Sequence, residues 1–264
     1  MKKFFSKFKE KIWDDKKRRA LFITLTSILL VIIIAFTASA IYLGTYYHAD
    51  DEAIASFTVE AEVNEERTKD GDWVFTPVAK QPTAGFIFYP GGKVEHDAYK
   101  PLMRELASKG VLCVLVEMPF RLAIFDVNAA DDIAENYPEI TAWYIGGHSL
   151  GGSMAASYVS KHSDEFKGLV LLAAYSTEDL QDSGLRVLSI YGDNDKVLNQ
   201  KAYESNLPNL PDDYEMHVIK GGNHAYFGMY GKQSGDGAAT ISNEEQIRKT
   251  AGMIAQFILR GSIV

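Results

Sequence analysis

Cysteine is almost absent from this sequence of 264 residues, which contains only Cys113. A single cysteine can form no internal disulfide and can supply no cysteine-rich metal site. Low-complexity sequence is absent as well, because 47% of the residues are hydrophobic and 23% are charged, as in ordinary globular proteins. The composition therefore predicts a compact core that is stable without disulfides or a structural metal.

Basic residues are scarce over most of the chain. Residues 1–19 hold nine of the 27 Lys and Arg residues and three acidic ones, so the remainder has 18 basic and 32 acidic residues, a net charge of −14. Clustered Lys and Arg side chains provide most of the affinity of proteins for phosphate backbones. The body of the protein is therefore not expected to bind nucleic acid.

Charged residues are completely missing from residues 20–43. As a helix that rises about 1.5 Å per residue, this segment would span roughly 36 Å, enough to cross the hydrocarbon core of a membrane. Four basic residues, Lys16 to Arg19, precede it, and three acidic residues follow it at positions 50–52. By the positive-inside rule, a single-pass protein is expected, with its N-terminus in the cytoplasm and its body outside.

The same segment could instead be a signal sequence. Ala38, Ser39 and Ala40 have the A-x-A form of a signal-peptidase site, and cleavage near Ala40 would release a secreted protein. The apolar run is longer than the roughly 7 to 15 residues of a usual signal sequence. Its length therefore favours an uncleaved anchor in the cell membrane.

This pattern divides the chain into four segments. They are a cytoplasmic basic tail (1–19), a transmembrane helix (20–43), a juxtamembrane linker (44–71) and one globular domain (72–264). A short apolar alternation in the linker, at Phe57, Val59, Ala61 and Val63, is a candidate edge strand.

The pattern of the globular domain predicts an α/β fold. From Asp72 onward, short apolar runs alternate with helical stretches, as in βαβ units around a mainly parallel sheet. Residues 111–116 are apolar throughout, as expected for a strand that helices cover on both faces, so Cys113 within them is expected to be buried. The predicted strands are 73–78, 84–89, 111–116, 143–147, 168–172, 186–191 and 214–219, and the predicted helices are 99–109, 127–136, 150–161, 200–206 and 243–259.

A glycine-rich turn at residues 147–152, Gly-His-Ser-Leu-Gly-Gly, joins a predicted strand to a predicted helix. A nucleophile on a sharp strand-to-helix turn needs glycine on both sides, because neighbouring side chains would collide there. Ser149 is therefore the candidate nucleophile, and the N–H of Leu150 is a candidate donor to a developing oxyanion. The alternative is a glycine-rich turn with a structural serine.

The other members of a catalytic triad are expected in the chain order serine, acid, histidine. His224 follows the predicted strand 214–219 and is the candidate general base. Two aspartates follow strand 186–191. Asp195 lies farther along the loop that must reach the histidine and is favoured, whereas Asp193 adjoins Gly192, could serve the turn itself and stays as the alternative.

A second oxyanion donor is expected in the loop after strand 84–89, where the sequence is Pro-Gly-Gly-Lys-Val at 90–94. Glycines in this loop let the backbone approach a substrate carbonyl, with the N–H of Gly92 or Lys93 as the donor, and a plain turn is the alternative. The loop 225–240 after the candidate histidine is long, so it could wall the pocket through Gln233 and Asp236, or simply be exposed. No metal site is expected, because the histidines lack metal-ligand spacing.

Five motifs extend over the chain from about residue 72 to its end: Tyr89-Pro90-Gly91-Gly92-Lys93-Val94, Met118-Pro119, Gly147-His148-Ser149-Leu150-Gly151-Gly152, Gly192-Asp193-Asn194-Asp195 and Gly222-Asn223-His224-Ala225-Tyr226-Phe227-Gly228. In these motifs the chain resembles the α/β-hydrolases, specifically the small lidless group similar to dienelactone hydrolases. The resemblance implies an α/β-hydrolase fold, a triad of Ser149, Asp195 and His224, and carboxylic-ester chemistry. Dienelactone hydrolases use a cysteine nucleophile where this chain has serine, so their substrate is not implied.

The sequence as a whole predicts a membrane-anchored serine hydrolase that needs no cofactor. It would cleave carboxylic esters or thioesters of small-molecule substrates through an acyl-enzyme. Only 13 residues join the strand that ends at Leu172 to the strand that begins at Arg186, so no lid domain fits there. Two alternatives stay open: a non-catalytic binding or sensor module on the same fold, and an amidase or acyltransferase. The sequence contains no indication of an oligomeric state.

Overall fold

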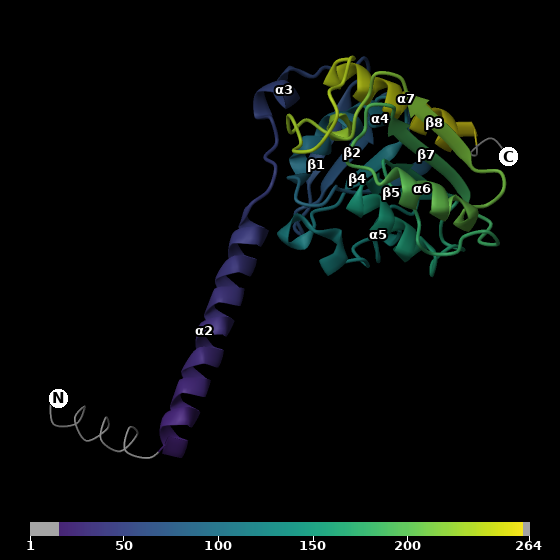
Figure 1. Cartoon of the computed structure of the whole chain (residues 1–264). Helices are drawn as coiled ribbons and strands as arrows, with labels where there is room; N and C mark the ends of the chain where they lie inside the picture. Colours follow the sequence, from purple (N-terminus) through teal and green to yellow (C-terminus); the bar gives the residue numbers. More distant parts are fainter. Residues whose placement is uncertain (1–15, 261–264) are drawn as a thin grey trace. The chain divides into compact units, whose positions relative to one another are not determined.

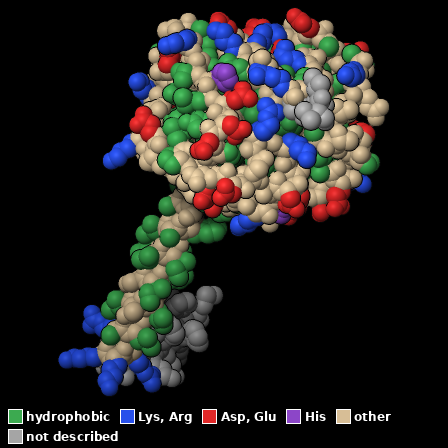
Figure 2. All heavy atoms as spheres, turned by 90° about the vertical axis from the view of Figure 1, so that its right-hand side faces the viewer, with side chains coloured by type: hydrophobic (Ala, Val, Ile, Leu, Met, Phe, Trp, Pro, Cys, Tyr) green, Lys and Arg blue, Asp and Glu red, His purple; other side chains and the backbone are tan. Residues whose placement is uncertain are grey.

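The computed structural model describes residues 16–260, and the predicted basic tail lies mostly outside them. The chain forms two compact units, one ending at Thr45 and the other beginning at Tyr46. The first unit contains the helix α2 (Lys16–Gly44), which has no buried side chain and is long and apolar enough to cross a membrane. Figure 2 shows apolar side chains along α2 and basic side chains at its N-terminal end. A signal sequence shares these properties.

The second unit is built around an eight-stranded sheet (Figure 1) with the strand order β1-β2-β4-β3-β5-β6-β7-β8. The six strands from β3 to β8 are parallel, and β1 and β2 run antiparallel at one edge. The predicted α/β class with a mainly parallel sheet is confirmed. The strands are β1 (Val63–Arg67), β2 (Trp73–Pro77), β3 (Ala84–Tyr89), β4 (Leu112–Leu115), β5 (Ala142–His148), β6 (Gly168–Leu172), β7 (Arg186–Gly192) and β8 (Glu215–Ile219).

Apolar side chains on both faces of the sheet hold the helices against it. In β3, Phe86 and Phe88 belong to the core cluster that includes Leu102 and Ile254, because alternate residues of a strand point to the same face. Ile87 points to the opposite face, whose core cluster includes residues of α5. The sheet is therefore covered on both sides. The helices of this unit are α3 (Asp51–Ser56), α4 (Lys100–Ala107), α5 (Leu150–Val159), α6 (Gln200–Asn206) and α7 (Asn243–Arg260).

The edge strand predicted from Phe57 to Val63 lies farther along the chain, because residues 57–62 form no strand and a helix occupies the segment before them. The Asp50 side chain accepts a hydrogen bond from the N–H of Ala53 at 3.0 Å and caps α3. Ile54 and Phe57 at the end of α3 are buried, so Phe57 packs in the core from the end of a helix. The edge strand begins only at Val63, which pairs with Pro77 of β2.

The predicted helix at residues 127–136 is wrong. Only a short 3₁₀ turn, η4 (Ala134–Asn136), forms there. The buried hydroxyl of Tyr89 donates to the carbonyl of Val127 at 2.9 Å and accepts from the N–H of Ala130 at 2.8 Å. The carbonyl of Val127 would begin a helical hydrogen-bond ladder, and the φ of 61° at Asp132 would interrupt that ladder. A tertiary contact thus replaces the helix.

Candidate active site

The turn between β5 and α5 holds Ser149 in a strained conformation. Its φ of 52° and ψ of −121° lie outside the regions that residues with side chains usually adopt. A side chain at Gly147 would not fit, because a Cβ there would lie 2.5 Å from the carbonyl oxygen of Tyr89. The N–H of Ser149 donates to the carbonyl of Leu172 at 2.9 Å, which ties the turn to the end of β6. The local sequence thus produces the sharp strand-to-helix turn.

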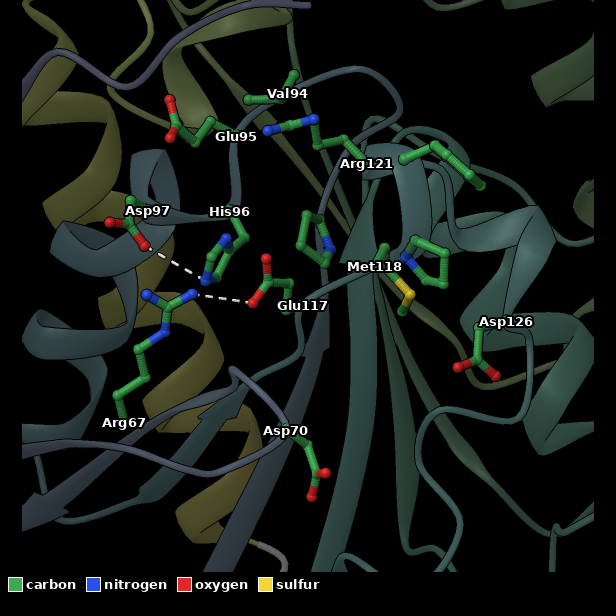
Figure 3. A pocket seen from close by; sticks show the side chains of 13 residues that line it. Arg67, Asp70, Val94, Glu95, His96, Asp97, Glu117, Met118, Arg121 and Asp126 are labelled. Carbon is green, nitrogen blue, oxygen red and sulfur yellow. Dashed lines mark hydrogen bonds and ion pairs between the residues drawn. The ribbon is translucent and has the colours of Figure 1, made fainter. Parts of the chain in front are cut away.

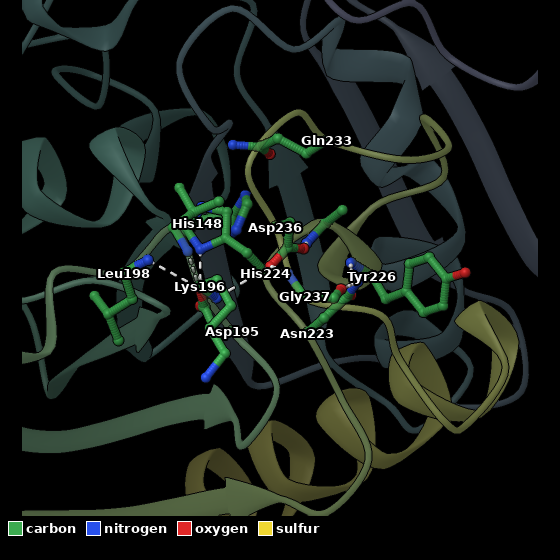
Figure 4. A network of polar contacts seen from close by, with 12 residues as sticks. His148, Asp195, Lys196, Leu198, Asn223, His224, Tyr226, Gln233, Asp236 and Gly237 are labelled. Carbon is green, nitrogen blue, oxygen red and sulfur yellow. Dashed lines mark hydrogen bonds and ion pairs between the residues drawn. The ribbon is translucent and has the colours of Figure 1, made fainter.

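His224 and Asp195 form a buried hydrogen-bonded pair (Figure 4). The distance between His224 Nδ1 and Asp195 Oδ2 is 2.8 Å, and the side chains are 2% and 0% exposed. The other carboxylate oxygen, Oδ1, accepts from the N–H groups of Val197 and Leu198, each at 2.8 Å. With Asp195 ionised, Nδ1 is the nitrogen that donates, which leaves a lone pair on Nε2. The Nε2 atom is buried and has no hydrogen-bond partner among the described residues.

Ser149 and His224 line the same pocket, which has a volume of about 280 Å³. No hydrogen bond joins their side chains in the described structure. Such bonds are often long without substrate and tighten in the reacting complex. The pocket is lined by Ser149, Leu150, Ser153, Ala173, Ala174, Tyr175, Val197, Leu198, Asn199 and His224.

Asp193 is used differently from Asp195. Its Oδ1 atom accepts from the N–H of Gly221 at 2.7 Å, and its Oδ2 atom lies 4.0 Å from Lys220 Nζ. Asp193 therefore ties the loop after β7 to the loop after β8. The aspartate that the structure brings to His224 is Asp195.

The two candidate donors in the loop after β3 differ in their surroundings. The N–H of Lys93 donates to the carbonyl of Arg121 at 2.7 Å and is therefore engaged. Gly92 packs against Leu150, since a Cβ on Gly92 would lie 2.9 Å from Leu150 Cδ2. Leu150 is the first residue of α5, so its N–H has no acceptor within the helix. Gly92 and Leu150 therefore lie next to each other, whereas the N–H of Lys93 is already hydrogen-bonded to Arg121.

Polar side chains hold the loop 225–240 that follows His224 (Figure 4). Asp236 accepts from the N–H of Ala225 at 2.9 Å and from the N–H of Lys196 at 3.2 Å. It therefore links the histidine loop to the loop that holds the acid. Gln233 accepts from the hydroxyl of Tyr230 at 3.0 Å. No residue of 225–240 lines the pocket of Ser149, so Gln233 and Asp236 stabilise the loops and are not pocket contacts.

Gln246 of α7 is a residue that sequence reasoning missed. Its side-chain oxygen accepts from the N–H of Asn223 at 3.0 Å, and its side-chain nitrogen donates to the carbonyl of Asn223 at 2.8 Å. Both bonds are buried and fix the backbone just before His224. The sequence signal that could have found it is a glutamine on the apolar face of a predicted helix. Such a glutamine is expected to be buried, and a buried amide needs hydrogen-bond partners.

The segment after the apolar helix packs on both loops around the candidate site. The N–H of Tyr47 donates to the carbonyl of Lys93 at 2.8 Å, and the N–H of Glu95 donates to the carbonyl of Tyr47 at 2.9 Å. The N–H of Asp50 donates to the carbonyl of Met229 in the loop after His224 at 2.8 Å. Residues 46–50, which the sequence assigns to a linker, are therefore held within the second unit.

A larger cavity of about 480 Å³ lies next to the loops after β3 and β4 (Figure 3). Neither Ser149 nor His224 lines it. Its charged side chains include an ion pair between Arg67 and Glu117 at 2.9 Å, and its only histidine, His96, lies 3.3 Å from Asp97. Among residues 16–260, no group of three His, Cys, Asp or Glu side chains is arranged to hold a metal ion. The candidate nucleophile Ser149 and the candidate base His224 line the smaller pocket instead.

Comparisons with known proteins agree with this architecture. Comparison with curated proteins finds no match. Among solved structures, the chain is similar to Est1E from Butyrivibrio proteoclasticus, with 14% identity and a TM-score of 0.52, over 76% of this chain and 98% of that one. It is also similar to the esterase domain of a Rhodothermus marinus protein, with 13% identity and a TM-score of 0.53, over 75% and 97% of the two chains. A third match is TT1662 from Thermus thermophilus, with 15% identity and a TM-score of 0.53, over 74% and 98%.

At these identities the structural likeness demonstrates the fold. The sequence itself provides the family, because the profile of the alpha/beta hydrolase family matches residues 85–248, more than half of the chain. The predicted resemblance to the α/β-hydrolases is confirmed. The chain belongs to the alpha/beta hydrolase family.

Proposed function

We propose that this hydrolase is a membrane-anchored serine esterase that cleaves carboxylic esters or thioesters of small molecules. The observation that supports this most is the buried His224–Asp195 pair, whose unpartnered Nε2 atom shares a pocket with Ser149. A serine hydroxyl is a weak nucleophile until a base removes its proton, and an oriented neutral imidazole is that base. Ser149, His224 and Asp195 therefore act as nucleophile, general base and orienting acid.

In the first half of the reaction, His224 Nε2 takes the proton of Ser149 as the serine oxygen attacks the substrate carbonyl carbon. The carboxylate of Asp195 stays ionised and stabilises the imidazolium that forms. The negative charge on the carbonyl oxygen is stabilised by the N–H groups of Leu150 and Gly92. When the tetrahedral intermediate collapses, His224 gives its proton to the departing alcohol or thiol, and an acyl group stays on Ser149.

In the second half, water replaces the leaving group. His224 takes a proton from this water as its oxygen attacks the acyl carbon. The second tetrahedral intermediate then releases the carboxylic acid, and the proton returns from His224 to Ser149. This sequence consumes one water and restores the enzyme without a metal or an organic cofactor.

The size and lining of the pocket favour substrates with a small, uncharged acyl group. Its volume is about 280 Å³, and its lining includes Leu150, Val197 and Leu198 but no Lys, Arg, Asp or Glu. A charged acyl group would lose hydration there without gaining a partner of opposite charge. Short apolar acyl esters are therefore the expected substrates.

Replacing the nucleophile tests this proposal. We expect Ser149→Ala to lower the turnover of a short-chain aryl ester by about 10⁴-fold or more, because no acyl-enzyme can form. The thermal unfolding of the variant should match that of the wild type. Ser157→Ala, on the same helix, removes a hydroxyl that bonds to Glu178 outside the pocket and serves as the control. Turnover by Ser149→Ala at the wild-type rate would refute the assignment.

A second prediction separates the two aspartates. Asp195→Asn should lower kcat by about 10⁴-fold, because an amide at this position favours the wrong tautomer of His224. Asp193→Asn keeps an oxygen that can accept from Gly221 and should hydrolyse the same ester at nearly the wild-type rate. Steady-state kinetics of both variants distinguish the roles. The reverse order of activities would assign the acid to Asp193.

We further propose that α2 is an uncleaved anchor, with residues 1–19 in the cytoplasm and the hydrolase unit outside. The 29-residue length of α2 supports an uncleaved anchor, and the basic cluster at Lys16 to Arg19 supports this orientation. Protease added to intact cells should then degrade the hydrolase unit and leave a short membrane-bound fragment. Full protection would reverse the orientation, and a protein found in the medium and beginning near Ile41 would indicate signal cleavage.

A further inference from the structure

The residue just before the candidate nucleophile, His148, is joined to a buried tyrosine. His148 is 1% exposed, and its Nδ1 atom lies 2.8 Å from the hydroxyl of Tyr99 in η1 (His96–Tyr99). The same hydroxyl accepts a hydrogen bond from the N–H of Gly91 at 3.1 Å. Tyr99 is fully buried. A single hydroxyl therefore connects the turn that holds Ser149 with the loop that holds Gly92.

The direction of these bonds follows from the number of protons. Burial raises the pKa of Tyr99, so its hydroxyl keeps its proton. The N–H of Gly91 uses one lone pair of the oxygen, and a buried hydroxyl proton left without an acceptor would be costly. Tyr99 therefore donates to Nδ1 of His148. The lone pair of the His148 ring is then on Nδ1, and its proton is on Nε2, which has no hydrogen-bond partner among the described residues. The opposite tautomer would leave both Nε2 and the hydroxyl proton of Tyr99 unpaired and is therefore less favourable.

His148 is held in its neutral form. Burial, and secondarily the proximity of His224, hold the pKa of His148 well below its usual value. The ring centroids of His148 and His224 are 4.5 Å apart (Figure 4). A charged ring at that distance would oppose the positive charge that His224 acquires during the proposed reaction. A neutral His148 packs beside His224 without this penalty.

The contact also explains why residue 91 is glycine. A Cβ at Gly91 would lie 2.6 Å from the Tyr99 hydroxyl oxygen and 2.7 Å from His148 Nδ1. The hydrogen-bonded pair of Tyr99 and His148 thus fills the space above the Gly91 Cα atom. Gly91 is bonded directly to Gly92, so this pair restrains the backbone that presents the Gly92 N–H.

We propose that Tyr99 and His148 are positioning residues. They hold the loop after β3, which presents the Gly92 N–H, in the correct position relative to Ser149. This inference rests on the proposed function, since it assigns the Gly92 N–H to the oxyanion of the ester reaction. Neither side chain needs to touch the substrate. The negative charge on the carbonyl oxygen is absent from the bound ester and develops only in the transition state and the tetrahedral intermediate, so a misplaced donor should lower kcat and leave KM nearly unchanged.

Three substitutions test this role. Tyr99→Phe removes the shared hydroxyl, and His148→Leu removes the acceptor, so each should lower kcat for a short-chain aryl ester by about 100-fold with little change in KM. In His148→Asn, the amide oxygen can occupy the place of Nδ1 and accept from Tyr99, so this variant should keep most of the activity. Tyr158→Phe removes a different tyrosine hydroxyl, bonded to Asp131, and is the control for the loss of such a group.

A transition-state analogue separates positioning from general destabilisation. The inhibition constant of a trifluoromethyl ketone, which forms an oxyanion on the serine, should rise in Tyr99→Phe by the same factor as kcat/KM falls. Loss of stability alone would lower the unfolding temperature without this proportional change. Wild-type kcat in Tyr99→Phe and His148→Leu, or equal losses in His148→Asn and His148→Leu, would overturn the proposal.

A spectroscopic measurement tests the contact independently of ester turnover. In the full-length protein labelled with ¹⁵N-histidine at neutral pH, His148 should show an unprotonated Nδ1 and a protonated Nε2. Tyr99→Phe should shift the Nδ1 signal. A protonated Nδ1 in the wild type would contradict the inference even if the enzyme is active. The expected tautomer in an inactive enzyme would instead show that the contact exists and that the proposed function fails.

Discussion

The hydrogen bond between His224 and Asp195 is the interaction on which the rest of the site depends. A buried carboxylate is costly unless its oxygens are hydrogen-bonded, and here two backbone N–H groups and the imidazole meet that requirement. The bond selects the tautomer of His224 and leaves a lone pair on Nε2. Without it, His224 could present a proton rather than a base to the pocket. The surrounding loops keep this pair in place.

The parallel sheet makes such a site possible because it brings distant segments to one edge. The loops after β3, β5, β7 and β8 hold Gly92, Ser149, Asp195 and His224, respectively. Polar contacts then join these loops to one another: Tyr99 links the first two, Asp193 and Asp236 link the last two, and Gln246 fixes the last from α7. These contacts restrain the loops that supply the site residues, and residues 46–50 add a further restraint on the loops after β3 and β8.

The sheet and the candidate triad were predictable from the sequence because local patterns encode them. Continuous apolar runs mark the strands, and glycines mark the turn around Ser149. In the structure, Ser149 has the positive φ that such a sharp turn requires. The helix predicted at 127–136 failed because the Tyr89 hydroxyl, distant along the chain, binds the backbone there. Tyr99 had no local pattern to mark its role, and Gln246 was marked only as a glutamine on the apolar face of α7. Their contacts depend on how separate elements pack, which a single sequence does not reveal.

The central claim is that Ser149 is activated as a nucleophile, and labelling with a fluorophosphonate tests it most directly. Such a reagent bonds to a serine that a neighbouring base has activated, and ordinary serine hydroxyls do not react with it. The account predicts one phosphonyl adduct per folded chain, mapped by mass spectrometry to the peptide that contains Ser149 and lost when the protein is denatured before labelling. Absence of the adduct, or its location on another residue, would contradict the account.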